Sequence, residues 1–460
     1  MGSDLEKSKA HVLMVPFPAQ GHVTPLAQFG KRLAAKGIKV TMAYNKHLSK
    51  STHFGSLTSM EVAIISDGHD DGGLQSAKSL EEFLESVKTV GSKDLTELIT
   101  SRMKSPQPIT AIVYDSFLPW VHDVAKNFNL ITAAFLTQSL SVSFIYYQVH
   151  KGHLPLPLKD GTISIPGSSQ FGVDNAPSLV SSEHGIYPGF RDMVLQQFHG
   201  IQNADWLLSN IFYQLEPQAV EWFQQRWRLA TVGPTVPSMY VDKRIEDDKA
   251  YGLNIFVPEE TTCMSWLESK PVGSVVYVSF GSFALYGEEQ LKELALGLKE
   301  SGSYFIWVVR ATEVDKLPNH YTRDVSDRGL IVNWSPQLDV LAHESVGCFV
   351  THCGFNSVLE AVCLGVPMVA IPQWTDQPTN AKFVEDVWKI GIRVEQDETR
   401  VVRREVVADC VKTVMVGEKG KEMKDNARKW KELARIAISE GGSSDLCISE
   451  FVSDIVNSVI

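Results

Sequence analysis

The chain has 460 residues, of which 44% are apolar and 21% charged, with 32 glycines and 21 prolines. These are ordinary values for globular domains, and they exclude disordered, collagen-like and disulfide-rich miniature proteins. The net charge is −11, of which −10 falls on residues 241–460, so the sequence excludes a protein that wraps DNA or RNA, which needs positive charge.

All six cysteines lie in the second half of the sequence, and no two of them form a C-x-x-C pair. This spacing is typical neither of a zinc site nor of a disulfide framework, and it fits a reducing compartment. No apolar run reaches the roughly 18 residues that a membrane-spanning helix requires. We therefore expect a cytoplasmic protein without an integral membrane segment, and we expect it to be a monomer.

Strand-like and helix-like patterns alternate through the first half of the sequence. Leu26, Phe29 and Leu33 recur at helical spacing between two short apolar runs, which predicts a βαβ unit. Residues 150–200 are rich in glycine, proline and serine, and they are predicted to form long loops and short helices over a pocket. The apolar runs typical of buried parallel strands lie at residues 11–15, 38–44, 110–115 and 131–136.

The second half of the sequence repeats this alternation after a segment without clear apolar periodicity, residues 241–256, which is predicted to be an interdomain linker. The two series predict two doubly wound α/β domains, at residues 1–240 and 257–440. Residues 441–460 have the pattern of an amphipathic helix that either completes the second domain or crosses back to the first. Apolar runs in this half lie at residues 274–280, 304–309, 329–334, 347–352 and 366–371.

The stretch from Trp334 to Gln377 carries the clearest chemical signal. A predicted buried strand at 347–352 is followed by a tight turn and by a helix that opens at Asn356–Ser357. The first turn of such a helix presents free N–H groups and the positive end of the helix dipole, which bind anions. The side chains suit a nucleotide: His352, Asn356 and Ser357 for phosphate oxygens, Glu360 for ribose hydroxyls, Trp334 for a base, and Asp376 and Gln377 for neutral hydroxyls.

Each of these residues taken alone has a simpler interpretation. Asn356–Ser357 could do no more than cap a helix, Trp334 could be a core residue, and His352 could be a structural histidine. Their conjunction after predicted strands favours a ligand site, because open α/β sheets bind ligands at the carboxyl ends of their strands.

The 44-residue stretch closely resembles the signature box of plant family 1 UDP-glycosyltransferases, which has the same length from a Trp to a Gln. The resemblance extends over the whole chain, including Q-G-H at 20–22, YDSFLPW at 114–120 and F-G-S at 280–282. It implies an α/β fold of the GT-B type, in which two Rossmann-like doubly wound domains face each other across a cleft. The second domain would bind the donor and the first domain the acceptor.

The resemblance also implies roles for the residues of a donor site. Trp334 would stack on uracil, and the backbone of Ser335 would contact the base. The ribose would be held by Gln337 and Glu360. The diphosphate would be held by Ser282, His352, Asn356 and Ser357. The sugar would be held by Thr137, Trp374, Asp376 and Gln377, and the final Gln resembles the form associated with glucose.

Gly354 and Phe355 complete the predicted donor set, and Phe355 departs from the family pattern, which usually has Trp there. If this residue acts through its backbone N–H, the departure changes little. If an indole normally donates to the sugar, donor affinity or selectivity differs in this chain.

His22 is a candidate general base, because a neutral imidazole at the end of a strand can take the proton of a hydroxyl near neutral pH. Its partner has to be a carboxylate that fixes the tautomer, and Asp115 ends another strand of the same predicted domain. Alternatively, His22 caps a helix that begins near Val23, and Asp115 caps the turn before Leu118. The resemblance favours the catalytic pair.

We therefore expect an inverting, metal-independent glucosyltransferase that uses UDP-glucose as co-substrate and no cofactor. The acceptor is expected to be a hydroxyl of a lipophilic plant small molecule (a steroid, triterpenoid or phenolic), which yields a β-glucoside. The alternative is glucose-ester formation on a small aromatic acid, whose carboxylate is already ionised and needs little help from a base. The predicted acceptor pocket is lined by Phe17, Phe83, Trp120, Phe144, Tyr147 and Phe190.

Two other classes of protein would require different sequence features. A nicotinamide oxidoreductase should show G-x-G-x-x-G after a strand, and no such loop follows the first strand or residue 280. A carrier of lipophilic molecules needs neither the His22–Asp115 pair nor a complete donor box.

Overall fold

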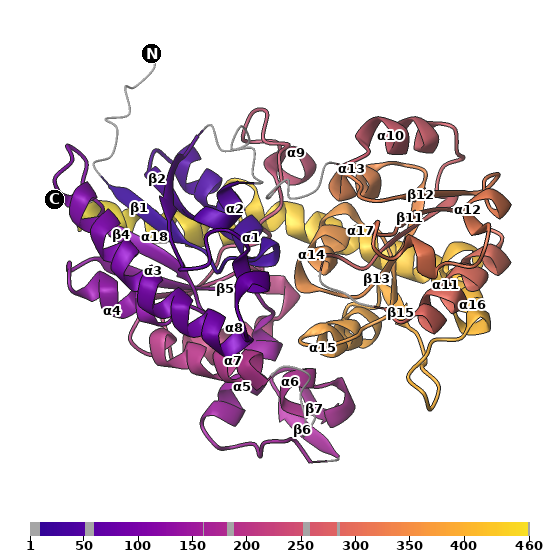
Figure 1. Cartoon of the computed structure of the whole chain (residues 1–460), viewed down its shortest axis with the longest axis horizontal. Coiled ribbons are helices and arrows are strands. Elements are labelled where there is room, and N and C mark those ends of the chain that lie inside the picture. Colours follow the sequence, from indigo (N-terminus) through magenta and orange to yellow (C-terminus); the bar gives the residue numbers. More distant parts are fainter. Residues whose placement is uncertain are drawn as a thin grey trace. The chain divides into compact units, whose positions relative to one another are not determined.

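The computed structural model of the chain describes residues 10–50, 59–159, 161–181, 188–251, 258–282 and 286–458 (Figure 1). The chain divides into two compact units. Unit 1 comprises the described parts of Met1–Ile255 and Ile436–Ile460, and unit 2 those of Phe256–Arg435. Each unit is built around its own parallel sheet.

The described part of unit 1 contains a seven-stranded parallel sheet in the order β3-β2-β1-β4-β5-β8-β9. Its central strands are apolar runs that are buried on both faces, as expected for a parallel sheet covered by helices. The strands are β1 (His11–Val15), β2 (Lys39–Asn45), β3 (Glu61–Ile65), β4 (Ala111–Asp115), β5 (Ile131–Leu136), β8 (Trp206–Ser209) and β9 (Leu229–Thr231).

Helices surround this sheet, and one short antiparallel hairpin, formed by β6 (Thr162–Ile165) and β7 (Ser168–Gly172), lies outside it. The prediction of loops and short helices over 150–200 is therefore wrong in part, because this region also holds the hairpin and the 14-residue helix α7. The helices of unit 1 are α1 (Gln20–Ala35), α2 (Lys46–Ser49), α3 (Leu80–Met103), α4 (Trp120–Lys126), α5 (Leu140–His150), α6 (Ser178–Ser181), α7 (Pro188–Ile201), α8 (Pro217–Gln224), α9 (Ser238–Val241) and α18 (Ser443–Asn457).

The described part of unit 2 contains a six-stranded sheet in the order β12-β11-β10-β13-β14-β15, and its strands are parallel. Numbered from its first strand, this order is 3-2-1-4-5-6, the order of Rossmann domains. The strands are β10 (Val275–Ser279), β11 (Tyr304–Val308), β12 (Gly329–Val332), β13 (Val346–Thr351), β14 (Met368–Ala370) and β15 (Gly391–Arg393).

Most helices of unit 2 follow one of its strands, whereas α10 precedes the first of them. The packing of α11 against α16 is part of a core that also includes strands β10, β11 and β13. Helix α17 (Glu418–Ile438) belongs to unit 2 as far as Arg435, and its last residues belong to unit 1. The other helices are α10 (Glu260–Glu268), α11 (Glu288–Ser301), α12 (Tyr321–Asp324), α13 (Gln337–Ala342), α14 (Phe355–Leu364), α15 (Gln377–Lys382) and α16 (Arg404–Val416).

Helix α1 anchors the segment that was predicted as a linker. The described part of that segment, residues 241–251, packs on unit 1: the Lys31 ammonium donates to Asp248 at 2.8 Å and to the carbonyl of Ala250 at 2.7 Å. Arg32 forms a bidentate pair with Asp242. Residues 241–251 are therefore part of unit 1, because buried charges on α1 hold them there.

Helix α18 also packs on unit 1, against β9 and α1 (Figure 1). Its Phe451 ring contacts Phe29 of α1 and Trp206 of β8. Lys36, the residue that follows α1, donates to Asp445 at 2.8 Å, and Arg244 donates to the same carboxylate oxygen at 3.0 Å. Residues 241–251 and helix α18 lie before and after unit 2 in the sequence. Both are thus held by α1 and by Lys36, the residue that follows it.

We predict that Lys31→Met destabilises the protein by about 3–5 kcal/mol, because it leaves Asp248 buried without its ammonium partner. Both side chains of this pair are almost fully buried, at 6% and 4% exposure. Urea unfolding followed by fluorescence measures the loss. The control is Lys126→Met, which removes a half-exposed pair with Asp205 in the same unit and should cost less than about 1 kcal/mol. Equal losses in the two variants would contradict the role given to Lys31.

Candidate active site

A histidine–carboxylate pair lies at the carboxyl ends of the two central strands of unit 1. Helix α1 begins at Gln20, three residues earlier than predicted, so His22 lies in its first turn after β1. Its Nδ1 donates to Oδ2 of Asp115, the last residue of β4, at 2.7 Å. The Asp115 side chain is fully buried, whereas that of His22 is 19% exposed. The paired His22 ring can therefore reach a ligand.

Asp115 makes both of the contacts considered for it. Its Oδ1 accepts the backbone N–H of Phe117 at 3.0 Å, which caps the turn after β4, while Oδ2 accepts from His22. A neutral imidazole that donates from Nδ1 carries its lone pair on Nε2. The carboxylate therefore sets the tautomer that a general base requires.

Three further residues surround the His22 ring. Thr137, which follows β5, places its hydroxyl 3.2 Å from His22 Nδ1. The rings of Phe17 and Phe117 lie edge-on or tilted to the imidazole, at centroid distances of 5.3 Å and 4.9 Å. Sequence reasoning named Phe17 as an acceptor residue and Thr137 as a sugar contact, but it missed Phe117. Phe117 could have been found from its position two residues after Asp115, within the YDSFLPW segment that resembles the family.

The other predicted acceptor residues contact other parts of unit 1. Phe144 and Tyr147 of α5 pack on Trp222 of α8, at centroid distances of 4.8 Å and 5.5 Å. The Phe83 ring contacts His69. The remaining two are Trp120, which packs where Gly91 of α3 leaves room for its ring, and Phe190, a half-buried residue of α7.

In unit 2, four predicted donor residues form one hydrogen-bonded network. Gln337, the first residue of α13, donates from Nε2 to Ser357 Oγ at 3.2 Å and to Glu360 Oε2 at 2.6 Å. Ser335 joins them through a residue that sequence reasoning missed, Tyr277 of β10, whose hydroxyl lies 2.8 Å from Ser335 Oγ and 3.0 Å from Gln337 Oε1. The SVVYVSF run was interpreted as a strand, and no signal in it pointed to the tyrosine.

The turn between β13 and α14 has the features predicted for an anion site. Helix α14 begins at Phe355 after Gly354, so Asn356 and Ser357 lie in its first turn and neither is the residue that caps it. Phe355 is itself only 4% exposed, so its ring is packed inside unit 2. Cys353 has a left-handed φ of 62°, a conformation that costs energy in a non-glycine residue. The turn is therefore held in one strained shape.

Two glycines leave room for the His352 ring. A Cβ atom at Gly281 would lie 2.9 Å from its Cε1, and one at Gly354 would lie 2.5 Å from its Nε2. Burial lowers the pKa of His352 to about 4. The ring is therefore neutral at pH 7 and offers an N–H donor without a positive charge.

The loop between β14 and α15 is tied to this turn. Asn380 donates to the carbonyl of Cys353 at 2.9 Å and to Asp376 at 2.7 Å. Gln377 Oε1 accepts the backbone N–H of Trp374 at 3.2 Å, which fixes the loop from within. Asp376, Gln377 and Trp374 therefore lie next to the turn that carries His352, as the signature box implies.

Two more predicted donor residues lie at the ends of neighbouring strands. Ser282 follows β10, and its carbonyl accepts from Arg310 at 2.8 Å. Trp334 follows β12 and is half-buried, and its carbonyl accepts the N–H of Glu259 at 3.0 Å. All the predicted donor residues of unit 2 thus follow or flank the carboxyl ends of its strands.

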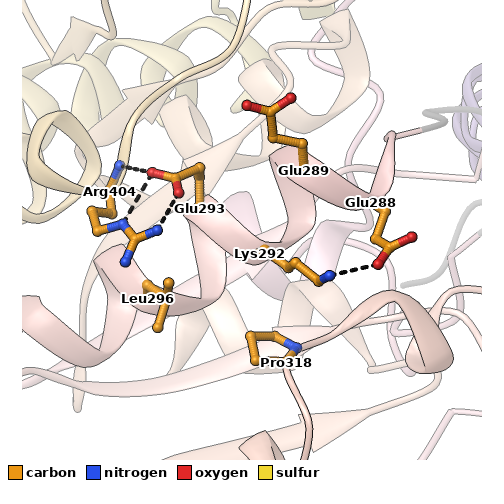
Figure 2. A pocket seen from close by; sticks show the side chains of 7 residues that line it. All are labelled: Glu288, Glu289, Lys292, Glu293, Leu296, Pro318 and Arg404. Atoms are coloured by element: carbon orange, nitrogen blue, oxygen red, sulfur yellow. Dashed lines mark hydrogen bonds and ion pairs between the residues drawn. The ribbon is translucent and has the colours of Figure 1, made fainter.

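A pocket of about 550 Å³ on unit 2 contains none of the predicted site residues. Figure 2 shows two ion pairs among its lining residues: Lys292 reaches Glu288, and Arg404 at the start of α16 reaches Glu293 of α11. The Arg404–Glu293 pair ties α16 to α11, whereas Lys292 and Glu288 lie one turn apart on α11, and none of these residues belongs to the predicted donor set. Its lining residues are Glu288, Glu289, Lys292, Glu293, Leu296, Pro318 and Arg404.

Within the described residues, no cluster of three or more His, Cys, Asp or Glu side chains is arranged to hold a metal ion. The acidic turn at Asp67–Asp71 is neutralised locally, since Asp70 pairs with Lys46 and Asp71 with Lys50. No helix in the described part of the chain is both long enough and apolar enough to cross a membrane.

Known proteins resemble this chain in sequence and in fold. A family model described as "UDP-glucoronosyl and UDP-glucosyl transferase" matches residues 247–434. Mogroside I-E synthase of Siraitia grosvenorii is 47% identical, over 98% of this chain and 99% of its own length. Flavonol 7-O-beta-glucosyltransferase UGT74F1 of Arabidopsis thaliana is 45% identical, over 98% and 99%. The crystal structure of Os79 from O. sativa in complex with UDP has a TM-score of 0.90 and 39% identity, over 96% of this chain and 100% of that one.

The chain therefore belongs to the plant family 1 UDP-glycosyltransferases, and it has the GT-B fold with two Rossmann-like domains. It is a UDP-glucosyltransferase, with a UDP-sugar as its donor.

His352 should contribute to the acid sensitivity of folding. Its pKa is about 4 in the folded chain, compared with 6.5 for an imidazole that is not buried, so between these values the unfolded chain binds a proton that the folded chain does not. Stability should therefore fall as the pH decreases from 6.5 to 4, with a contribution from this residue on the order of 3 kcal/mol.

The variant His352→Gln should lose this part of the pH dependence in unfolding measured from pH 7 to pH 4. His153→Gln, which alters an exposed side chain, is the control and should keep the slope of the wild type. If His352→Gln leaves the pH dependence of the free energy of unfolding unchanged, the contribution assigned to His352 is contradicted.

We predict that UDP affinity falls less than about threefold between 0.05 and 0.5 M salt, because screening weakens long-range attraction and spares short hydrogen bonds. Arg310, a basic residue beside Ser282, is paired with Glu313 at 3.0 Å and donates to the Ser282 carbonyl. Titration calorimetry with UDP at four salt concentrations measures the slope. A steep loss of affinity would reveal a basic contact outside the residues assigned above.

Proposed function

We propose that the enzyme transfers glucose from UDP-glucose, with inversion, to a hydroxyl of a lipophilic plant small molecule, a steroid, triterpenoid or phenolic. The product is a β-glucoside. The observation that carries this proposal is the 2.7 Å hydrogen bond between His22 Nδ1 and the buried Asp115. It gives unit 1 a base whose lone pair points away from its carboxylate partner.

The proposed reaction uses this pair as follows. The acceptor hydroxyl gives its proton to His22 Nε2 as its oxygen attacks the anomeric carbon of glucose. The bond between that carbon and the phosphate oxygen breaks, and UDP leaves with the electron pair. Asp115 stabilises the imidazolium that results, because its negative charge lies on the far side of the ring.

The leaving group is proposed to need no metal ion. The negative charge that develops on UDP meets the N–H groups in the first turn of α14, the hydroxyl of Ser357 and the neutral His352 donor. These groups are fixed by the turn before the reaction starts, so they need little reorganisation as the charge develops.

A lipophilic acceptor is supported by the surroundings of the base. Phe17 and Phe117 flank His22, and both are nearly buried, so an acceptor that reaches Nε2 meets apolar rings. Among the relatives, the Arabidopsis enzyme is named for a flavonol 7-hydroxyl and a β-glucoside, which supports a phenolic or similar hydroxyl as the target. A cytoplasmic location and a monomeric state stay predictions from the sequence.

We predict that His22→Ala loses most glucosyl transfer, at least about a hundredfold, because it removes the general base. UDP affinity should stay within about twofold, since the residues proposed to hold the uracil, ribose and diphosphate lie in unit 2. Asp115→Ala should lose less, because it removes only orientation and charge support. The measurement is product mass after incubation with UDP-glucose, UDP-galactose or UDP-xylose and a panel of hydroxyl and carboxyl acceptors.

His153→Ala is the matched control, since this exposed histidine bonds only locally, to Gln148; its transfer rate should equal that of the wild type. Near-normal transfer to hydroxyls by His22→Ala would contradict the proposal. Transfer retained on carboxylic acids alone would instead identify glucose-ester formation, because an ionised carboxylate needs no base.

A further inference from the structure

The hydroxyl of Tyr277 lies beneath the donor residues of unit 2. Tyr277 is fully buried in β10, and its ring stacks on Phe349 of the adjacent strand β13, with a centroid distance of 5.1 Å and an interplanar angle of 24°. Strands β10 and β13 are the central pair at which the order of the sheet reverses. The tyrosine is thus fixed at the point of the sheet where Rossmann domains bind nucleotides.

The protons of this network can have only one arrangement that satisfies every group. Gln337 uses its two amide hydrogens on Ser357 and Glu360, so its Oε1 needs a donor. The Tyr277 hydroxyl donates its single proton to that oxygen at 3.0 Å. Tyr277 then accepts from the hydroxyl of Ser335 at 2.8 Å. The result is a directed chain of hydrogen bonds from Ser335 through Tyr277 and Gln337 to the Glu360 carboxylate.

This chain determines which way the Gln337 amide points. Rotating the amide by half a turn would place its oxygen against the carboxylate of Glu360 and its NH2 group against the tyrosine hydroxyl. A buried hydrogen bond to Tyr277 at one end and a charged partner at the other therefore hold a single orientation. Without the tyrosine hydroxyl, Oε1 loses its donor and only the Glu360 end remains.

We propose that Tyr277 is a positioning residue for donor binding: it fixes Gln337, and through Gln337 Glu360, in the orientation that recognises the ribose of the UDP-sugar. This inference rests on the proposed function for the placement of the donor in unit 2. Tyr277 itself does not touch the ligand, because its hydroxyl is occupied by protein partners within the core: Ser335, Gln337 and Ser279.

The test is Tyr277→Phe, which deletes the hydroxyl and keeps the ring that stacks on Phe349. UDP dissociation constants from calorimetry should rise roughly five- to tenfold, since a buried acceptor is left without its donor. KM for UDP-glucose should rise with them, while kcat changes less than about twofold, because the interaction serves ground state and transition state alike. An unchanged dissociation constant would overturn the proposal.

The matched control is Tyr321→Phe. Tyr321 is also buried in unit 2, and its hydroxyl donates to the carbonyl of Ala295 at 2.7 Å, within the core and outside the donor network. Both variants should lower the melting temperature, whereas only Tyr277→Phe should weaken UDP binding. If Tyr321→Phe weakens UDP binding to the same extent, Tyr277 acts through general stability and the proposal fails.

Two further readouts separate positioning from a general effect. In a Gln337→Ala background, Tyr277→Phe should cause no additional loss of UDP affinity, because both substitutions act on one interaction; independent, multiplying losses would overturn the proposal. The preference for UDP over 2′-deoxy-UDP should also fall severalfold in Tyr277→Phe, since ribose recognition is what the tyrosine supports; an unchanged preference would contradict that link.

A second variant keeps the test decisive if Tyr277→Phe does not fold. Ser335→Ala removes a hydroxyl that hydrogen-bonds to Tyr277, and it should raise the UDP dissociation constant about two- to threefold; no change would contradict the chain of hydrogen bonds. All of these measurements use UDP without an acceptor. If the wild-type chain binds UDP but transfers no glucose, the proposed function is refuted and this inference stands. If the wild-type chain does not bind UDP, both are refuted.

Discussion

The reversal of strand order at the middle of each parallel sheet determines where the functional residues can meet. Crossover connections between parallel strands are right-handed, so helices that follow strands on the two sides of the reversal lie on opposite faces of the sheet. The loops at the carboxyl ends of these strands therefore separate and leave space between them. At this point in unit 1 His22 follows β1 and Asp115 ends β4, and in unit 2 Ser282 and His352 follow β10 and β13.

Buried hydrogen bonds then orient the side chains that the sheets bring together. Asp115 is fully buried and uses one oxygen for the backbone of its own turn and the other for His22. In unit 2 the buried Tyr277 hydroxyl has a similar role, since it donates to Gln337 and holds its amide in one orientation. A buried polar group without a partner is costly, so each of these arrangements favours a single geometry.

Helix α1 connects the proposed chemistry to the organisation of the chain. Its first turn carries His22, and its later turns carry Lys31 and Arg32, which hold residues 242–250 by buried or half-buried ion pairs. Helix α18 packs its Phe451 against the same helix. Helix α1 thus carries His22 and also contacts residues 242–250 and helix α18. The position of the His22 side chain therefore depends on segments that lie more than 200 residues away in the sequence.

Much of this protein was determined by the sequence alone, because the signals are local. Apolar runs predicted the central strands to within a few residues, and the spacing of the signature box identified the family and predicted a set of donor residues. The strands that were not predicted, β3, β6, β7, β8, β9 and β15, have three to five residues each, and β3 is partly exposed, so their patterns are too short to stand out. Tertiary structure decided what depends on packing between distant segments: the contacts of Phe117 with His22 and of Tyr277 with Gln337, the packing of Phe144 and Tyr147 on α8, and the place of α18 in unit 1. No local pattern encodes these contacts, because each forms only after the sheet has brought its strands together.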